Sequence, residues 1–140
     1  MEPTTDRPDV DIEEDIKQII NTFTPLKTSK PYFTLQVSNG VVTVQGNVRN
    51  PQARRVLLDN APRITGVQKV DASAFFDDEQ VRYDVGGVLP PGVHASVLFG
   101  AVALTGKLPE HATAEAIITL VSQVAGVRRV GVDFGEAKTG

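Results

Sequence analysis

The feature that most constrains the fold of this chain is an internal repeat with a constant offset. Glycines and valines return 60 residues later: Gly40 as Gly100, Gly46 as Gly106, Gly66 as Gly126, Val42 as Val102, Val67 as Val127 and Val70 as Val130. Self-similarity at a fixed spacing indicates one supersecondary unit used more than once. Because glycines and apolar side chains transfer neither protons nor groups, the pattern describes a duplicated scaffold.

The composition is that of a folded protein and excludes several classes of site. A chain of 140 residues has room for one ordinary domain or two small ones, and 41% apolar residues can supply a core. The net charge of −3 argues against a general nucleic-acid surface, which needs a basic stripe. The absence of cysteine excludes disulfides, thiolate zinc sites and cysteine nucleophiles.

The sequence shows neither a transmembrane segment nor a signal peptide. No apolar run approaches the roughly 18–20 residues of a membrane-spanning helix. The N-terminal segment MEPTTDRPDVDIEED is acidic, whereas a signal peptide begins with basic residues followed by an apolar stretch. As written, the sequence predicts a cytoplasmic protein, or a periplasmic or exported one if a leader has been removed.

The first copy begins with a helix. Residues 1–10 lack periodicity and are expected to form a disordered tail. Residues 11–23 then place isoleucines at helical spacing, with Asp11 as the expected N-cap and acidic residues in the first turn.

A hairpin, a second helix and a third strand complete the first copy. Apolar and polar residues alternate on both sides of Asn39-Gly40, the strongest short hairpin signal. Asn50 is the expected N-cap of a helix over residues 51–65, and a strand over 67–76 follows.

The second copy repeats the hairpin, with Phe99-Gly100 at its tip, then a helix over about 110–125 and a strand over 127–134. Residues 77–91 are expected to form a linker without a helix, because two adjacent glycines and two adjacent prolines interrupt it. The predicted fold class is therefore α+β: helix–β–β–helix–β followed by β–β–helix–β, with the helices on one face of small sheets.

A second copy without its first helix would expose part of its sheet. Val97, Val102 and Leu104 are the apolar side chains expected on that face. The first copy, another chain or an apolar ligand would have to cover them. A homo-oligomer through the second module is therefore one of the alternatives.

This pattern resembles the BON domain, a module of bacterial osmotic-stress and nodulation proteins. The resemblance is carried by three segments of the first copy and their counterparts in the second: 39–46, 51–65 and 66–70, with Gly100, Val102, Leu104, Gly106 and 126–130. It covers residues 11–75 as a full module and 93–135 as a truncated one. We therefore expect a first module at 11–76, a second, truncated module at 92–135 and a frayed C-terminus at 136–140.

The resemblance implies a non-catalytic binding or scaffold module. BON domains are associated with attachment to phospholipid or to other cell-envelope components, and in some proteins with potassium sensing. Phospholipid or an envelope protein is therefore the expected partner, and a soluble sensor of a small ligand or of potassium is the alternative. A potassium site built from backbone carbonyls would leave little trace in a sequence.

Six basic residues are candidates for contact with lipid headgroups or a partner: Arg54, Arg55 and Arg63 on the helix at 51–65, Lys69 on the next strand, and Arg128 and Arg129 at a similar place in the second copy. Each basic residue close to a charged membrane contributes about 1 kcal/mol. An ordinary solvated helix face is the alternative interpretation of the same residues.

No motif points to a metal, a nucleotide or catalysis. His94 and His111 fall in different elements without further ligands at metal-binding spacing, and the acidic run Asp77-Asp78-Glu79 lacks the spacing of a calcium loop. No glycine-rich phosphate loop precedes a helix, so Gly46 and Gly106 are expected to mark close packing by a neighbouring helix. No nucleophile–base order is recognisable, so we expect neither an enzyme nor a resident cofactor.

Overall fold

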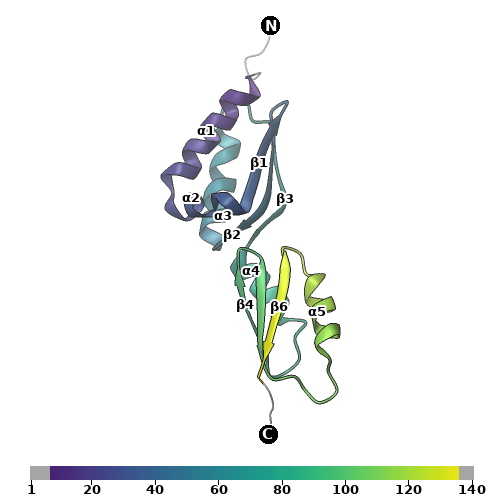
Figure 1. Cartoon of the computed structure of the whole chain (residues 1–140). Coiled ribbons are helices and arrows are strands. Elements are labelled where there is room, and N and C mark those ends of the chain that lie inside the picture. Colours follow the sequence, from purple (N-terminus) through teal and green to yellow (C-terminus); the bar gives the residue numbers. More distant parts are fainter. Residues whose placement is uncertain (1–6, 136–140) are drawn as a thin grey trace.

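The computed structural model describes residues 7–135, which form two small α+β modules placed end to end (Figure 1). Most of the tail expected at 1–10, and the whole C-terminus expected at 136–140, lie outside the described residues. Within the described part, Asp9 already begins the first helix, two residues earlier than expected.

The first module is a three-stranded sheet with its helices on one face (Figure 1). Its elements are α1 (Asp9–Thr22), α2 (Thr24–Ser29), the 3₁₀ turn η1 (Lys30–Tyr32), β1 (Phe33–Ser38), β2 (Val41–Val48), α3 (Pro51–Asn60), η2 (Ala61–Arg63) and β3 (Lys69–Asp77). Strand β2 lies in the middle, antiparallel to β1 and parallel to β3. The helix, hairpin, helix and strand expected for this copy are confirmed, but the helix expected over 51–65 ends as an α-helix at Asn60 and continues as the 3₁₀ turn η2 only to Arg63.

The second module repeats this topology. Its elements are α4 (Asp78–Gly86), β4 (Val93–Leu98), β5 (Ala101–Gly106), α5 (Ala114–Ser122) and β6 (Arg129–Phe134). The registers match as well, since Phe33 pairs with Gly46 in one hairpin and Val93 with Gly106 in the other. The central strand β5 is again parallel to the last strand. Helix α5 is shorter than the helix expected at 110–125.

The expectation of a linker without a helix at 77–91 is wrong, because α4 occupies its first half. The two first helices share a pattern of an aspartate followed by two buried aliphatic residues, Asp9-x-x-Ile12-x-x-x-Ile16 and Asp78-x-x-Val81-x-x-x-Val85, at an offset of 69 residues. The offset changes because α4 is shorter than α1 and no counterpart of α2 separates it from β4. The paired glycines that suggested a break lie at the end of the helix, where glycine is common.

Helix α4 removes the reason to expect an uncovered sheet. Val97, Val102 and Leu104 are at most 9% exposed and share one core with Val81 and Val85 of α4. Each module therefore has its own core, and the first is centred on Ile16, Leu57 and other buried residues of α1, the sheet and α3.

Helix caps explain where the helix before the last strand of each module, α3 or α5, begins. The Asn50 side chain accepts a hydrogen bond from the Ala53 N–H at 2.8 Å, which confirms the expected cap of α3. In the second module Thr113 takes this role for α5, so His111 lies in the preceding turn. Asp11, expected to cap α1, instead lies in its first turn.

Gly46 and Gly106 mark a close approach, but not of the kind expected. A Cβ at Gly46 would collide with the backbone of Tyr32 and Phe33, and one at Gly106 with the backbone of Gly92. These neighbours belong to the chain entering the paired strand, so the expected packing of a helix over these glycines is wrong.

A carboxylate at the start of each first helix holds the hairpin turn of the same module. Asp9 accepts hydrogen bonds from the N–H groups of Asn39 at 2.9 Å and Gly40 at 3.1 Å. Asp78 does the same for Phe99 at 2.6 Å and Gly100 at 3.0 Å. Charged acceptors strengthen such bonds. We call this arrangement the carboxylate clamp.

Replacing Asp9 with alanine should therefore destabilise the first module. We expect Asp9→Ala to lower the free energy of unfolding by about 1.5–3 kcal/mol, the value of hydrogen bonds to a charged group. Asp11→Ala, in the same helical turn but outside the clamp, should cost under about 1 kcal/mol. Urea denaturation of both variants measures the difference, and equal losses would contradict the role assigned to Asp9.

Candidate functional site

The two modules are joined without a linker. Asp77 ends β3, and its side chain accepts a hydrogen bond from the Gln80 N–H at 2.8 Å, so it also caps α4. Asp78, the first residue of α4, is 4% exposed. The last strand of one module thus passes directly into the first helix of the next.

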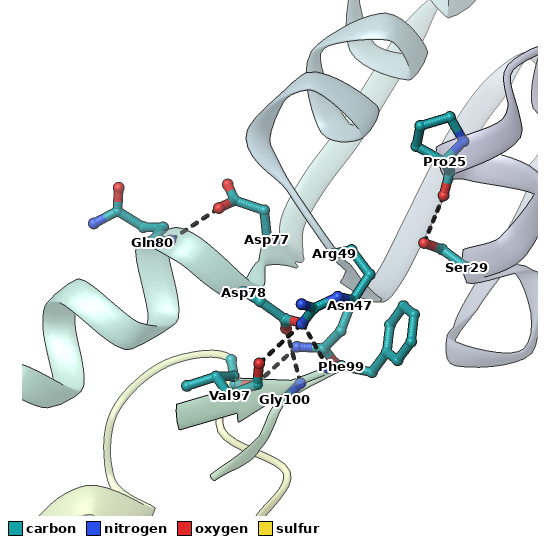
Figure 2. A network of polar contacts seen from close by, with 11 residues as sticks. Pro25, Ser29, Asn47, Arg49, Asp77, Asp78, Gln80, Val97, Phe99 and Gly100 are labelled. Carbon is teal, nitrogen blue, oxygen red and sulfur yellow. Dashed lines mark hydrogen bonds and ion pairs between the residues drawn. The ribbon is translucent and has the colours of Figure 1, made fainter. Parts of the chain in front are cut away.

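Polar contacts join the first module to the second (Figure 2). Arg49, between β2 and α3, donates hydrogen bonds to the Asp78 carboxylate at 2.6 Å and to the Val97 carbonyl at 2.9 Å. The buried Asn47 side chain donates to the Gly126 carbonyl at 2.9 Å. The Asp78 carboxylate therefore takes part both in the carboxylate clamp of the second module and in an ion pair with Arg49 of the first module.

An aromatic pair reinforces this junction. The rings of Tyr32 and Phe99 are stacked, with centroids 3.8 Å apart and planes 6° from parallel. The Arg49 guanidinium lies 5.8 Å from the centre of the Phe99 ring. Phe99 has a φ of 49°, which is unusual for a bulky residue, so its backbone is strained.

A cleft of about 350 Å³ opens beside the aromatic pair. It is lined by Pro31, Tyr32, Leu98, Phe99, Ala101, Arg128 and Arg129. We call it the junction cleft, because its walls come from both modules.

The junction cleft combines positive charge with exposed apolar surface. Arg128 and Arg129 are exposed, and neither forms an ion pair with a carboxylate within residues 7–135. Leu98 is 57% exposed and Tyr32 39% exposed. Free guanidinium groups bind carboxylates and phosphates, and the neighbouring rim can contact apolar atoms.

The structure brings two of the six predicted basic residues to this cleft. Arg54 instead donates to the Phe75 carbonyl at 2.9 Å and lies over the Phe75 ring, which ties α3 to β3. Arg55, Arg63 and Lys69 are exposed on α3, η2 and the start of β3, and none of them lines the junction cleft. Contact of the six with lipid or a partner stays a prediction.

The acidic run at 77–79 and the two histidines lie outside the junction cleft. Asp77 and Asp78 act in the cap and the clamp, whereas Glu79 is exposed in the first turn of α4. His94 is exposed on β4, and His111 is exposed in the turn before α5. Within residues 7–135, no group of three His, Asp or Glu side chains is arranged to hold a metal ion.

One exposed carboxyl has a shifted pKa for a local reason. The Ser73 backbone N–H and then its hydroxyl donate to Asp71, at 3.1 and 2.8 Å, and lower the pKa of that carboxyl below its ordinary value. The contact lies where the pairing of β2 with β3 shifts register. It stabilises a bulge and involves no residue of the junction cleft.

Sequence reasoning did not identify Tyr32, Asn47, Arg49 or Phe99 as residues of the junction. One signal was present, since Phe99 occupies the turn position held by Asn39 in the first copy. Both residues have positive φ, which asparagine adopts readily and phenylalanine does not. A bulky residue at that position indicates a contact outside the turn.

Comparison with known proteins identifies both modules. The family model described as BON domain matches residues 8–74 and 78–134, so the second match includes α4. No curated protein sequence matches the chain significantly.

Two similar solved structures come from Chlamydia trachomatis. One is described as CdsD, a structural protein of the type III secretion system; it is 16% identical, with 89% of this chain and 91% of that chain covered and a TM-score of 0.37. The other is the C-terminal domain of CdsD, also 16% identical, with 93% and 100% covered and a TM-score of 0.35. Within residues 7–135 of the present chain, none of the helices has the length and hydropathy needed to cross a bilayer.

The junction should weaken when Arg49 loses its charge. Arg49→Gln leaves the buried Asp78 without its cationic partner, and we expect a loss of about 1–3 kcal/mol in the free energy of unfolding. Arg55→Gln removes the same charge from an exposed position on α3 and should change stability by less than about 0.5 kcal/mol. Urea denaturation measures both variants, and an unchanged free energy of unfolding in Arg49→Gln would refute the importance of the ion pair.

Proposed function

Because the chain belongs to the BON domain family, with one copy at residues 8–74 and another at 78–134, we propose that it is a non-catalytic binding module that recognises an anionic phospholipid surface through its junction cleft. Family membership supports a scaffold or binding role over an enzymatic one. The lipid and the site are our inference from the geometry.

The observation that carries this proposal is the pairing of Arg128 and Arg129 with Leu98 and Tyr32 in one cleft. A phospholipid headgroup presents a phosphate next to apolar chains. The two guanidinium groups suit the phosphate, and the exposed leucine and tyrosine suit the boundary between headgroups and acyl chains.

Electrostatics limits the strength of this contact. Each arginine close to an anionic surface contributes about 1 kcal/mol, and the whole chain carries a net charge of −3. Binding should therefore be weak, local to the cleft and sensitive to salt. An envelope protein with a phosphate or carboxylate on its surface is the alternative partner.

Sedimentation with lipid vesicles tests the proposal. The chain should bind vesicles containing phosphatidylglycerol more tightly than vesicles of phosphatidylcholine alone, and the difference should shrink at high salt. Replacing both cleft arginines, as Arg128→Gln with Arg129→Gln, should weaken binding about thirtyfold, from about 2 kcal/mol of lost attraction.

A matched double variant separates the cleft from general charge. Arg55→Gln with Arg63→Gln removes the same charge from exposed positions outside the cleft and should retain most of the binding. Equal weakening by both double variants would overturn the assignment to the cleft. The absence of any anionic preference at low salt would overturn the lipid proposal and favour the protein partner.

Potassium sensing remains the alternative function to be tested. An ion that binds only the folded chain must raise the thermal midpoint of the protein. A potassium sensor would therefore melt at a higher temperature in potassium chloride than in sodium chloride. Identical midpoints over a saturating range would remove this alternative.

A further inference from the structure

The last strand of the second module has an open edge. In the sheet order β4-β5-β6, strand β6 pairs with β5 on one side, and no other strand within residues 7–135 pairs with it. Four of its six residues are exposed: Arg129, Gly131, Val132 and Asp133. An edge strand presents unpaired N–H and C=O groups, which can pair with a strand of another chain.

The pairing of β6 with β5 shows which backbone groups point outward. The two strands pair in unbroken register along the whole of β6, and the Gly135 N–H donates to the Gly106 carbonyl at 2.7 Å. Successive residues of a strand direct their backbone groups to opposite sides, so the odd-numbered residues face β5. The N–H and C=O groups of Val130 and Val132 therefore face away from the sheet.

The equivalent edge of the first module is protected. Strand β3 carries a bulge where its pairing with β2 shifts register, and there the Asp71 side chain accepts hydrogen bonds from Ser73. Bulges are one of the devices that keep edge strands from pairing with other chains. Strand β6 has no such shift, and the counterparts of Asp71 and Ser73 sixty residues later are Gly131 and Asp133. The second module thus presents a regular edge that the first module lacks.

Two residues of β6 are not explained by contacts within their own chain. Gly131 does not have a positive φ, and a Cβ placed on it would meet no atom within 4 Å, so neither conformation nor space requires glycine. Glycine inside a strand weakens it and often marks a close approach of another backbone. Val132 is 40% exposed, whereas its counterpart in the first module is the smaller, half-buried Ala72. Both features fit a strand that another strand covers.

We infer that β6 pairs antiparallel with β6 of a second copy of this chain, which joins two three-stranded sheets into one of six strands. The charges of β6 are symmetric about Gly131, since Arg129 lies two residues before it and Asp133 two residues after it. When the two Gly131 residues lie opposite each other, each Arg129 lies opposite an Asp133. Opposite charges directly across an antiparallel pair attract each other.

The same register satisfies the backbone. Val130 and Val132 carry the outward-facing groups, and in this register each Val130 lies opposite a Val132, so they form hydrogen-bonded pairs. Arg129 and Asp133 then face each other in non-hydrogen-bonded pairs, where side chains come closest. Sliding one strand by two residues would keep the backbone bonds but would separate both ion pairs. One register therefore meets both requirements.

The charge order favours a second copy over other occupants. An extended segment of another protein could use the same backbone groups, but β6 carries the charges that complement its own. This contact differs from the oligomer expected through the sheet face of the second module, because α4 packs into the core on that face. Arg129 also lines the junction cleft, so the pairing engages one of the two cleft arginines of each chain.

Charge reversal tests the pairing in the absence of lipid, so its failure would leave the phospholipid proposal standing. A contact between two short strands is small, and we expect a dissociation constant of the order of 100 µM by sedimentation equilibrium. Asp133→Arg places like charges opposite each other at both ends of the strand pair and should weaken self-association at least about tenfold. Arg129→Asp should have the same effect.

A mixture of the two variants gives the decisive measurement. In a mixed pair, the two arginines of one chain lie opposite the two aspartates of the other. Asp133→Arg and Arg129→Asp should therefore associate with each other as tightly as the unaltered chain with itself. Glu79→Arg makes the same charge change at an exposed position on α4 and should leave self-association unchanged. Failure of the mixture to associate, or equal weakening by Glu79→Arg, would overturn the inference.

A single cysteine locates the axis of the pair. Because the chain contains no cysteine, Gly131→Cys introduces one thiol, which faces the same thiol of the second copy within reach of a disulfide. Mild oxidation should cross-link this variant at least about tenfold faster than Thr105→Cys, whose thiol is exposed on the neighbouring strand β5. Equal cross-linking of the two variants would overturn the inference. A chain that stays monomeric at millimolar concentration would overturn it as well, and would leave the edge to a segment of another protein.

Discussion

The bond on which the rest of this structure depends is the one between a helix-starting carboxylate and two backbone N–H groups of a hairpin turn. Asp9 and Asp78 each make this contact, so each module closes its sheet against its first helix at the same point. The turn offers two N–H groups on its outer side because both of its central residues have positive φ. A carboxylate accepts both at once, and no apolar contact could satisfy them.

In the second module the same carboxylate also connects the two halves of the molecule. Asp78 binds its own turn and the Arg49 guanidinium, while Phe99 of that turn stacks on Tyr32 (Figure 2). Stacking of the Phe99 ring on Tyr32 of the other module therefore helps to hold this phenylalanine at its strained positive φ. The interaction that closes one module and the interaction that orients the pair share one side chain, so loss of Asp78 would affect both.

Much of the fold followed from the sequence because its signals were local. The hairpins at Asn39-Gly40 and Phe99-Gly100, the cap at Asn50 and the repeat itself are confirmed. Helix α4 was not expected, because a constant offset of 60 was extended into a region where the true offset is 69. An aspartate followed three and seven residues later by aliphatic residues, as at the start of α1, is the sequence signal that would have revealed α4.

The candidate sites depended on contacts between distant residues, which no single sequence displays. The basic character of Arg128 and Arg129 could be seen, but their meeting with Tyr32 at one cleft could not. A local sequence pattern predicts helices and strands, whereas a site at the junction of two modules can be found only in the packed structure.

The direct passage of β3 into α4 has a consequence for what the chain can do as a whole. No residue separates the end of β3 at Asp77 from the start of α4 at Asp78, and both side chains accept hydrogen bonds, so the modules meet through a continuous backbone without a linker. A molecule bound in the junction cleft would contact both modules at once, because the cleft walls come from Tyr32 of the first module and from Phe99 and Arg128 of the second.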